Sequence, residues 1–246
     1  MKNLHTEKLV VNDTNVNFEM KLSITEIIRF LQLTTFNHSN IIELDHKTMQ
    51  EKSNAFWVIT KLKVRLNKSV SSGETIKVAT WTQPLSTIRA IRDFKIKQKN
   101  SVIAKACAEW CCLDLNTRRI RKLSTIQYPN LEMVEKGTSN LTFNNLNQEY
   151  SSNNFAYSRT IRSSDIDINN HTNNLKYNTI AIDAFSVEEL KTFEIKEYEI
   201  HFVNESKEGD VINVYKKKIG NTYFIEGVTE EKVIFKVCLK IKKREI

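Results

Sequence analysis

The residues best suited to chemistry gather in one polar segment, residues 164–174, just before an amphipathic stretch. It reads Ser-Asp-Ile-Asp-Ile-Asn-Asn-His-Thr-Asn-Asn. If the segment is extended, its alternation places four side chains on one side, namely Asp165, Asp167, Asn169 and His171. An amide and the free backbone N–H groups of a helix start can hold a developing oxyanion, and a histidine can transfer a proton. The set suits chemistry at an electrophilic carbonyl.

An Asx-rich turn that only caps the following helix is the alternative for this segment. Asn173 and Asn174 are good N-cap candidates, and asparagines of this kind are common in solvated turns. Capping alone does not require a histidine between the asparagines, however. The presence of His171 favours the chemical interpretation.

Two segments carry the apolar spacing of helices, one in each half of the chain. Ser23 and Glu26 form the pattern of a capping box at the start of the first. Apolar residues then recur at i, i+3, i+4 and i+7 in both segments. The two stripes are Ile24, Ile27, Ile28 and Leu31, and Tyr177, Ile180, Ala181 and Ala184. The second predicted helix therefore begins directly after the polar segment.

Strands are predicted after each helix. Residues 56–66, 198–202 and 233–241 alternate apolar with polar or basic residues. This period of two is typical of antiparallel strands with one face on a core and the other in water. Each half is thus a helix followed by long antiparallel strands. The predicted class is α+β, with a sheet wrapped around its own helix.

The two halves also repeat one another in sequence. The pattern of residues 73–78 recurs at 209–214, and that of residues 102–107 recurs at 233–238. The shared order and the similar spacing predict a tandem duplication. A polar, Asn- and Ser-rich segment separates the copies. We therefore expect an N-terminal domain over residues 1–128, a linker over residues 129–154 and a C-terminal domain over residues 155–246.

The composition excludes several classes of protein. The 246 residues are 40% hydrophobic, which excludes global disorder, and no apolar run approaches the roughly 18–20 residues that span a bilayer. Five glycines and two prolines argue against Gly-rich nucleotide-binding loops. The first residues lack the apolar core of a signal peptide. These features predict a soluble, cytoplasmic protein.

The cysteines and the basic charge have simple interpretations. The cysteines, Cys107, Cys111, Cys112 and Cys238, lack the spacing of a disulfide framework or a metal site, so reduced core thiols and no metal are expected. His38 is expected to line a groove or to lie at the surface, and His201 to face solvent. The net charge is +8, but the aromatic residues fall on apolar faces, which argues against nucleic-acid binding.

The pattern Asp-x-Asp-x-Asn-x-His-x-Asn-Asn-x-x-Tyr over residues 165–177 resembles the signature of the acyl-[acyl-carrier-protein] thioesterases, the plant FatA and FatB enzymes and their bacterial relatives. Shorter similarities follow in the family's order at residues 31–38, 57–65, 73–75, 79–81 and 116–119. The resemblance therefore covers nearly the whole chain. It implies tandem hot-dog domains, each a long helix wrapped by an antiparallel sheet.

The resemblance also implies the site residues. The family's functional aspartate, asparagine and histidine correspond to Asp167, Asn169 and His171. An ungapped alignment on the strand at residues 211–212 places Glu205 at the family's glutamate and Ser206 at its cysteine. Serine at this position excludes a thiol nucleophile there and favours direct attack by water. Either His171 or Glu205 would activate the water, and no cofactor is implied.

The expected function is hydrolysis of acyl-[acyl-carrier-protein] to free fatty acid and holo-carrier. Acyl-CoA hydrolysis and non-catalytic acyl binding are the alternatives, because acyl-CoA presents the same pantetheine arm. The basic strand face of Lys61, Lys63 and Arg65 and the turn at residues 117–122 are either solvated or a docking surface for the acidic carrier protein. A monomer with pseudo-dimeric halves and a homodimer both remain open.

Overall fold

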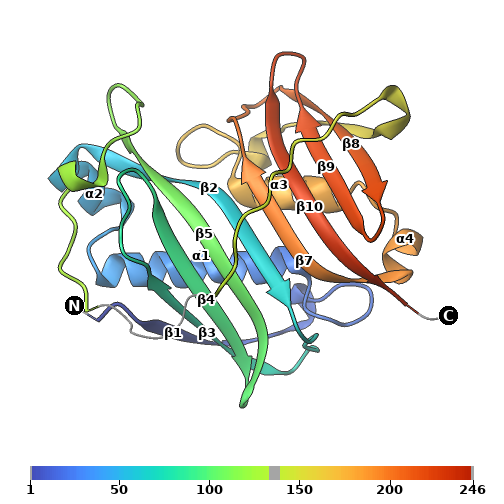
Figure 1. Cartoon of the computed structure of the whole chain (residues 1–246), viewed down its shortest axis with the longest axis horizontal. Helices are drawn as coiled ribbons and strands as arrows, with labels where there is room; N and C mark the ends of the chain where they lie inside the picture. The colour runs from blue at the N-terminus through green and yellow to red at the C-terminus, as the bar shows by residue number, and fades with distance from the viewer. Residues whose placement is uncertain (1, 133–138, 245–246) are drawn as a thin grey trace. The chain divides into compact units, whose positions relative to one another are not determined.

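The computed structural model describes residues 2–132 and 139–244 (Figure 1). The chain forms two compact units, Met1–Thr142 and Phe143–Ile246. Each unit is described by itself below. No helix in the described ranges is long and apolar enough to cross a membrane.

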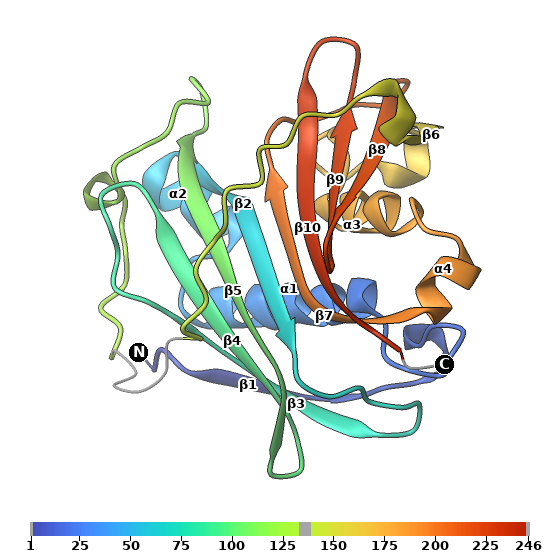
Figure 2. The same ribbon diagram turned by 45° about the vertical axis from the view of Figure 1, so that its right-hand side comes forward.

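The first unit is a helix laid along an antiparallel sheet (Figures 1 and 2). Its described strands lie in the order β1-β3-β4-β5-β2. The strands are β1 (His5–Val10), β2 (Ala55–Leu66), β3 (Thr75–Thr82), β4 (Ala90–Gln98) and β5 (Ser101–Asp114). Helix α1 (Ile24–Ile41) packs on the sheet, and the short α2 (His46–Ser53) leads into β2.

Helix α1 begins after the predicted cap residue Ser23, but the second bond of the predicted capping box is replaced, because the Ser23 N–H donates to Asn15 O at 3.1 Å. The Ser23 side chain caps it by accepting a hydrogen bond from the Glu26 backbone N–H at 3.2 Å. The predicted stripe from Ile24 to Leu31 is buried. The same face continues through Thr34 to His38, which is also fully buried. The expectation that His38 lies at the surface is therefore wrong, because its position continues the buried stripe.

The second unit repeats this arrangement with a shorter helix. Its described strands lie in the order β7-β10-β9-β8-β6, which matches β2-β5-β4-β3-β1 of the first unit. The strands are β6 (Phe155–Thr160), β7 (Phe193–Phe202), β8 (Val211–Ile219), β9 (Thr222–Val228) and β10 (Val233–Lys243), and the helices are α3 (Asn174–Ile182) and α4 (Val187–Lys191). Helix α3 has 9 residues, against 18 in α1. The α+β prediction is confirmed in both units.

The predicted duplication is visible in the turns that precede the third strand of each unit. Gly73 and Gly209 both have positive φ, 83° and 89°. The Gly73 N–H donates to Val11 O at 2.8 Å, and the Gly209 N–H donates to Ile161 O at 3.0 Å. Glycine recurs at this point because each turn requires a left-handed backbone.

One face of β7, which carries Glu199 and His201, was expected to be exposed to water and is covered instead. Glu199 is fully buried, and it accepts hydrogen bonds from the backbone N–H and the Nδ2 of Asn144 at 2.7 and 2.6 Å. His201 Nε2 lies 2.8 Å from Glu199 Oε1, and Phe143 packs edge-on against the His201 ring. His201 is therefore not a solvent-facing residue, because residues 143–144 cover this part of the strand.

Within the segment predicted as a linker, residues 129–154, the described residues 139–142 bind the first unit and residues 143–144 bind the second. Ser139 Oγ donates to Asp93 Oδ1 at 2.7 Å, and Lys63 Nζ donates to Thr142 O at 2.8 Å, both within the first unit. Residues 143–144 bind the second unit, as above. Residues 133–138 of the predicted linker lie outside the described residues. The domain limits at 128 and 155 stay a prediction.

Candidate active site

The chain segment before α3 is a compact turn and not an extended strand. A 3-10 turn covers Ser163–Asp165, and an isolated bridge then pairs Ile166 with Thr172. Between them the Asp167 N–H donates to His171 O at 2.9 Å. Asn170 has a positive φ of 60°, which reverses the chain. The one-sided alternation expected for an extended segment is therefore wrong.

Asp165 is removed from the other candidates by this turn. Its carboxylate is buried and lies 2.8 Å from Arg159 and 3.5 Å from Lys176. Burial alone would raise the pKa of Asp165. The Arg162 backbone N–H and the positive charges of Arg159 and Lys176 outweigh burial and hold that pKa below its usual value. Asp165 has the contacts of a structural ion pair.

His171 and Glu205 form the central contact of the site. His171 Nε2 lies 3.2 Å from Glu205 Oε2, with the two side chains 29% and 45% exposed. His171 comes from the turn before α3, and Glu205 comes from the loop after β7. A histidine and a carboxylate at this distance can share or transfer a proton, and both remain accessible to water.

Asp167 and Asn169 lie in the same turn as His171. Asp167 Oδ1 accepts a hydrogen bond from the Asn169 backbone N–H at 2.8 Å. The Asn169 side chain is exposed, and the neighbouring Ile168 is 85% exposed at the tip of the turn. The four predicted residues thus lie on one turn and one adjacent loop. Among the four predicted residues, His171 and Glu205 are the pair whose side chains contact one another across the two segments.

The start of α3 is capped as predicted. The Asn173 side chain accepts a hydrogen bond from the Leu175 N–H at 2.9 Å, and the Asn173 N–H donates to Asp165 O at 2.8 Å. Further along the helix, Asn178 Oδ1 accepts from the Tyr198 hydroxyl at 2.9 Å. The cap thus fixes the start of α3 directly after the turn.

A buried group of hydroxyls lies next to the His171–Glu205 pair, and the sequence did not mark it as functional. Ser206 is 2% exposed, and its Oγ lies 2.7 Å from Thr172 Oγ1 and 2.9 Å from the Tyr177 hydroxyl. Burial raises the pKa of Tyr177, with a smaller contribution from the Glu205 charge. Tyr177 is therefore a neutral phenol at physiological pH. The sequence places Tyr177 in the second apolar stripe and at the end of the signature, but it predicts no role for the hydroxyl.

The same turn precedes α1 in the first unit, with different side chains. The Asn17 N–H donates to Lys21 O at 2.8 Å, and Met20 has a φ of 58°. Asn17 Oδ1 accepts from the Glu19 N–H at 3.0 Å, as Asp167 does from Asn169. Lys21 occupies the position of His171, and its Nζ donates to Ser71 Oγ at 2.8 Å. The backbone of the turn is shared, and the histidine and carboxylate are specific to the second unit's turn.

The cysteines are core residues, as expected. The four thiols are free and buried. Burial raises the pKa of Cys112 to about 11, so its thiol is protonated and unreactive at neutral pH.

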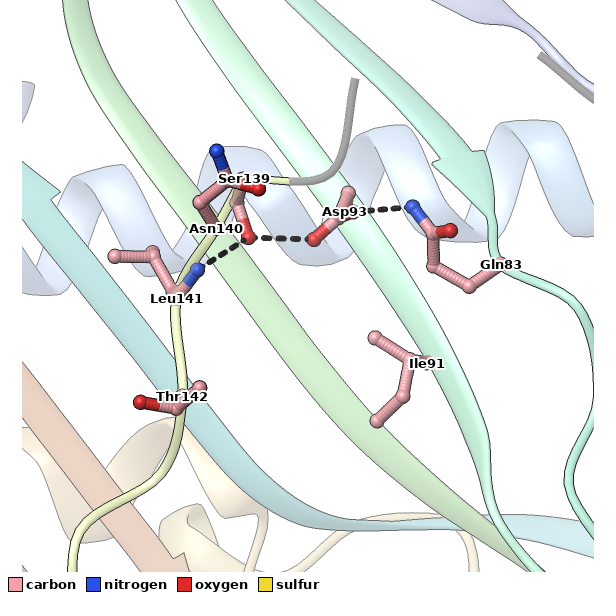
Figure 3. A pocket seen from close by; sticks show the side chains of 7 residues that line it. All are labelled: Gln83, Ile91, Asp93, Ser139, Asn140, Leu141 and Thr142. Atoms are coloured by element: carbon pink, nitrogen blue, oxygen red, sulfur yellow. Dashed lines mark hydrogen bonds between the residues drawn. The ribbon is translucent and has the colours of Figure 1, made fainter. Parts of the chain in front are cut away.

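A cavity of about 400 Å³ opens in the first unit (Figure 3). Gln83, Ile91, Asp93 and residues 139–142 line it. The buried Asp93 carboxylate accepts from Gln83 Nε2 at 2.5 Å and from Ser139 Oγ at 2.7 Å, so it is already hydrogen-bonded. Asp167, Asn169, His171 and Glu205 are absent from the lining of this cavity.

Comparison with known proteins gives consistent matches along the chain. The family models for the acyl-ACP (acyl carrier protein) thioesterase N-terminal domain and C-terminal domain match residues 2–126 and 147–245. Oleoyl-acyl carrier protein thioesterase 1 of Arabidopsis thaliana is 23% identical over 229 residues, which cover 85% of this chain and 62% of the relative. Palmitoyl-acyl carrier protein thioesterase of Cuphea hookeriana is 24% identical over 200 residues, covering 75% and 48%. Both are chloroplastic, and the chain spans about half to three fifths of their length.

Two solved structures share the fold over almost their whole length. An acyl-ACP thioesterase from Bacteroides thetaiotaomicron is 23% identical, with a TM-score of 0.83 and coverage of 98% of each chain. The 12:0-ACP thioesterase from Umbellularia californica is 15% identical, with a TM-score of 0.83 and coverage of 99% of each chain. These similarities confirm the predicted tandem hot-dog fold.

Proposed function

Since the chain belongs to the acyl-ACP thioesterase family, we propose that it hydrolyses acyl-[acyl-carrier-protein] to free fatty acid and holo-carrier. The observation that carries this proposal beyond family membership is the 3.2 Å contact between His171 Nε2 and Glu205 Oε2 beside the start of α3. The pair is partly exposed, so water and a thioester can reach it.

The chemistry requires little of the protein. A thioester carbonyl is electrophilic, and its thiolate is a good leaving group. Water adds to the carbonyl carbon, the tetrahedral intermediate expels the thiolate, and the proton lost by water ends on the leaving sulfur. The protein must orient the water, accept its proton and stabilise the oxyanion.

The proposed roles follow from where the side chains lie. His171 or Glu205 accepts the proton of the attacking water, and the other partner orients it. Asn169, which is exposed on the same turn, binds the carbonyl oxygen or the pantetheine arm. Asp167 holds the turn through the Asn169 N–H.

Direct attack by water fits the environment of residue 206. The Ser206 hydroxyl is buried and lies within hydrogen-bond distance of Thr172 and Tyr177. A serine nucleophile would need an exposed hydroxyl next to a base. Ser206 has neither, and this supports a mechanism without an acyl-serine intermediate.

The partner that the proposal requires is an acyl carrier protein with a fatty acyl group on its phosphopantetheine arm. Its acidic surface complements a chain of net charge +8. Buried free thiols fit a reducing compartment, and we propose a cytoplasmic location.

The test is hydrolysis by the purified protein of acyl-ACP and acyl-CoA thioesters of several chain lengths, measured by thiol release and by free fatty acid. We expect turnover of acyl-ACP, reduced at least about 100-fold by His171→Ala and by Glu205→Gln, because removing a general base usually costs 10²–10⁴ in rate. His46→Ala, at an exposed histidine of α2, is the matched control and should retain wild-type turnover.

Three outcomes would contradict parts of this proposal. Near-wild-type turnover by His171→Ala would remove His171 from the mechanism. Hydrolysis of acyl-CoA without hydrolysis of acyl-ACP would assign a different carrier. Binding of acyl chains without hydrolysis of any thioester would make the protein a non-catalytic acyl-binding member of the fold.

A further inference from the structure

Three buried hydroxyls are bonded together on the segments that carry His171 and Glu205. They belong to Thr172, Tyr177 and Ser206, each less than a tenth exposed. Ser206 Oγ is central, 2.7 Å from Thr172 Oγ1 and 2.9 Å from the Tyr177 hydroxyl. The three side chains therefore form one connected, solvent-free cluster, called here the hydroxyl cluster.

The hydroxyl cluster joins the two segments that carry the reacting groups. Thr172 follows His171 in the chain, and Ser206 follows Glu205. The Thr172 N–H donates to Ser206 O at 2.8 Å, and Thr172 Oγ1 donates to the same oxygen at 3.1 Å. Because Thr172 adjoins His171 and Ser206 adjoins Glu205, the bonds between Thr172 and Ser206 limit how far apart His171 and Glu205 lie.

Tyr177 holds the Glu205 side of this junction. Its hydroxyl oxygen accepts a hydrogen bond from the Ser206 backbone N–H at 3.0 Å. The ring packs against Phe235 and Phe202, with centroids 5.6 and 6.3 Å away. Phe235 in turn lies over Gly227, where a Cβ atom would come within 2.3 Å of its ring. The tyrosine hydroxyl therefore has a fixed position, set by the core of the second unit.

The first unit shows that the fold does not need these hydroxyls. There the Leu22 N–H donates to Val70 O at 2.8 Å, the same backbone bond that joins Thr172 to Ser206. Ile27, four residues after the cap Ser23, occupies the position of Tyr177, four residues after the cap Asn173. All three first-unit residues are buried and apolar.

The apolar residues of the first unit and the hydroxyls of the second stand at equivalent positions but differ in what they contribute to stability. Buried apolar residues stabilise this junction in the first unit, whereas burying hydroxyls costs desolvation that their hydrogen bonds only offset. The hydroxyls occur in the unit whose turn and loop carry the His171–Glu205 pair. We propose that Thr172, Tyr177 and Ser206 are positioning residues that hold Glu205 against His171 for the hydrolysis of the thioester. This inference rests on the proposed function.

The first test removes the Tyr177 hydroxyl and keeps the aromatic ring. Tyr177→Phe should lower kcat for acyl-ACP by about 10- to 100-fold, because displacement of a reacting group by about 1 Å can cost 10² in rate. KM should change less than about twofold, since the cluster does not touch substrate. The matched control is Tyr198→Phe, which deletes the hydroxyl of another buried tyrosine, bonded to Asn178 in the same unit. It should retain the wild-type kcat.

A double-mutant cycle tests whether Tyr177 acts through Glu205. In the Glu205→Gln background, Tyr177→Phe should have less than about a twofold further effect, because residues that act as a unit are not additive. Full additivity of the two changes would overturn the proposal. An equal loss of kcat in Tyr177→Phe and Tyr198→Phe would also overturn it, because the effect would then be general destabilisation.

A second measurement does not depend on activity. The ring resonances of His171, assigned with His171→Gln, should move in Tyr177→Phe and in Ser206→Ala toward their values in Glu205→Gln. The chemical shifts of the His171 ring should not change in Tyr198→Phe. Unchanged resonances in the first two variants would overturn the positioning role. If wild-type protein hydrolyses no thioester, the proposed function fails, while these resonances still decide whether the cluster holds the pair.

Discussion

At the scale of single residues, His38 shows how strongly the core changes a side chain. Its Nδ1 accepts a hydrogen bond from Arg92 at 2.7 Å, and its ring stacks on that of His5 with centroids 5.7 Å apart. Burial, followed by the charges of Arg92 and His5, lowers the pKa of His38 from 6.5 to about 4. His38 is therefore neutral in the folded protein near pH 6, whereas an unfolded chain would begin to protonate it.

This difference predicts a loss of stability on mild acidification. Between pH 6.5 and 4 the unfolded chain binds a proton at His38 that the folded protein does not, so the free energy of unfolding falls as the pH falls. The contribution of His38 to that loss is about 2 kcal/mol between pH 7 and 5. Urea unfolding at the two pH values, in wild type and in His38→Gln, should show a smaller loss in the variant. Equal losses would show that His38 does not titrate in this way.

The burial of His38 was readable in part from the sequence. Thr34 and His38 continue the helical spacing of the first apolar stripe beyond Leu31, but their polar types hide the continuation. The contact of Arg92 with His38 could not be predicted from a local pattern, because the two residues lie 54 positions apart in the chain. The hydroxyl cluster was missed for the same reason, since Thr172 and Tyr177 are near in sequence but Ser206 is not.

At the scale of elements, the turn before each helix is the clearest case of one backbone with two sets of side chains. In the first unit, Asn17 accepts from the Glu19 N–H at 3.0 Å, and in the second, Asp167 accepts from the Asn169 N–H at 2.8 Å. An amide and a carboxylate thus perform the same local task. The turn itself requires an acceptor at this position and not a negative charge.

Asp167→Asn therefore separates the two roles of Asp167. The free energy of unfolding should stay within about 0.5 kcal/mol of wild type, because the amide oxygen can still accept from Asn169. If the carboxylate takes part in hydrolysis, kcat should fall about tenfold or more in the same variant. Asp167→Ala, which also removes the acceptor, should lower both. Unchanged stability and unchanged kcat in Asp167→Asn would reduce Asp167 to a residue of the turn.

The sequence predicted the elements better than it predicted this turn. Period-two strands and the capped stripes are local signals, and they located β2, β7, β10, α1 and the start of α3. The alternation of residues 165–171 suggested an extended chain, yet the positive φ of Asn170 depends on backbone bonds across the turn. Asn17-Phe-Glu-Met-Lys folds the same way with few shared residues, so the turn leaves little trace in sequence.

At the scale of the whole molecule, charge and duplication were both visible from the sequence. The repeat predicted two similar units, and the matching strand orders within the two units bear this out. The cavity in the first unit was not predictable, because it forms where residues 139–142 return to the sheet near Asp93. The net charge of +8 gives the molecule a field that an acidic partner would experience before contact.

Salt should therefore weaken recognition of the carrier more than recognition of the acyl group. Raising ionic strength from about 50 mM to about 500 mM should increase the apparent KM for acyl-ACP several-fold, because it shortens the range of the attraction. The matched control is the uncharged acyl-pantetheine thioester, whose KM should change little. Equal changes in KM for the two substrates would exclude electrostatic steering by the carrier protein.

The matching turns at residues 17–21 and 167–171 point to an ancestor half as long, whose coding sequence was copied and joined to itself. In an assembly of two identical chains, every mutation appears in both copies at once. After fusion that constraint disappears. Lys21 is equivalent to His171 in the repeat, and Leu22 is equivalent to Thr172. These differences record substitutions that were accepted in one half of the chain alone. Selection could from then on alter one half of the polypeptide while leaving the His171–Glu205 contact of the other untouched.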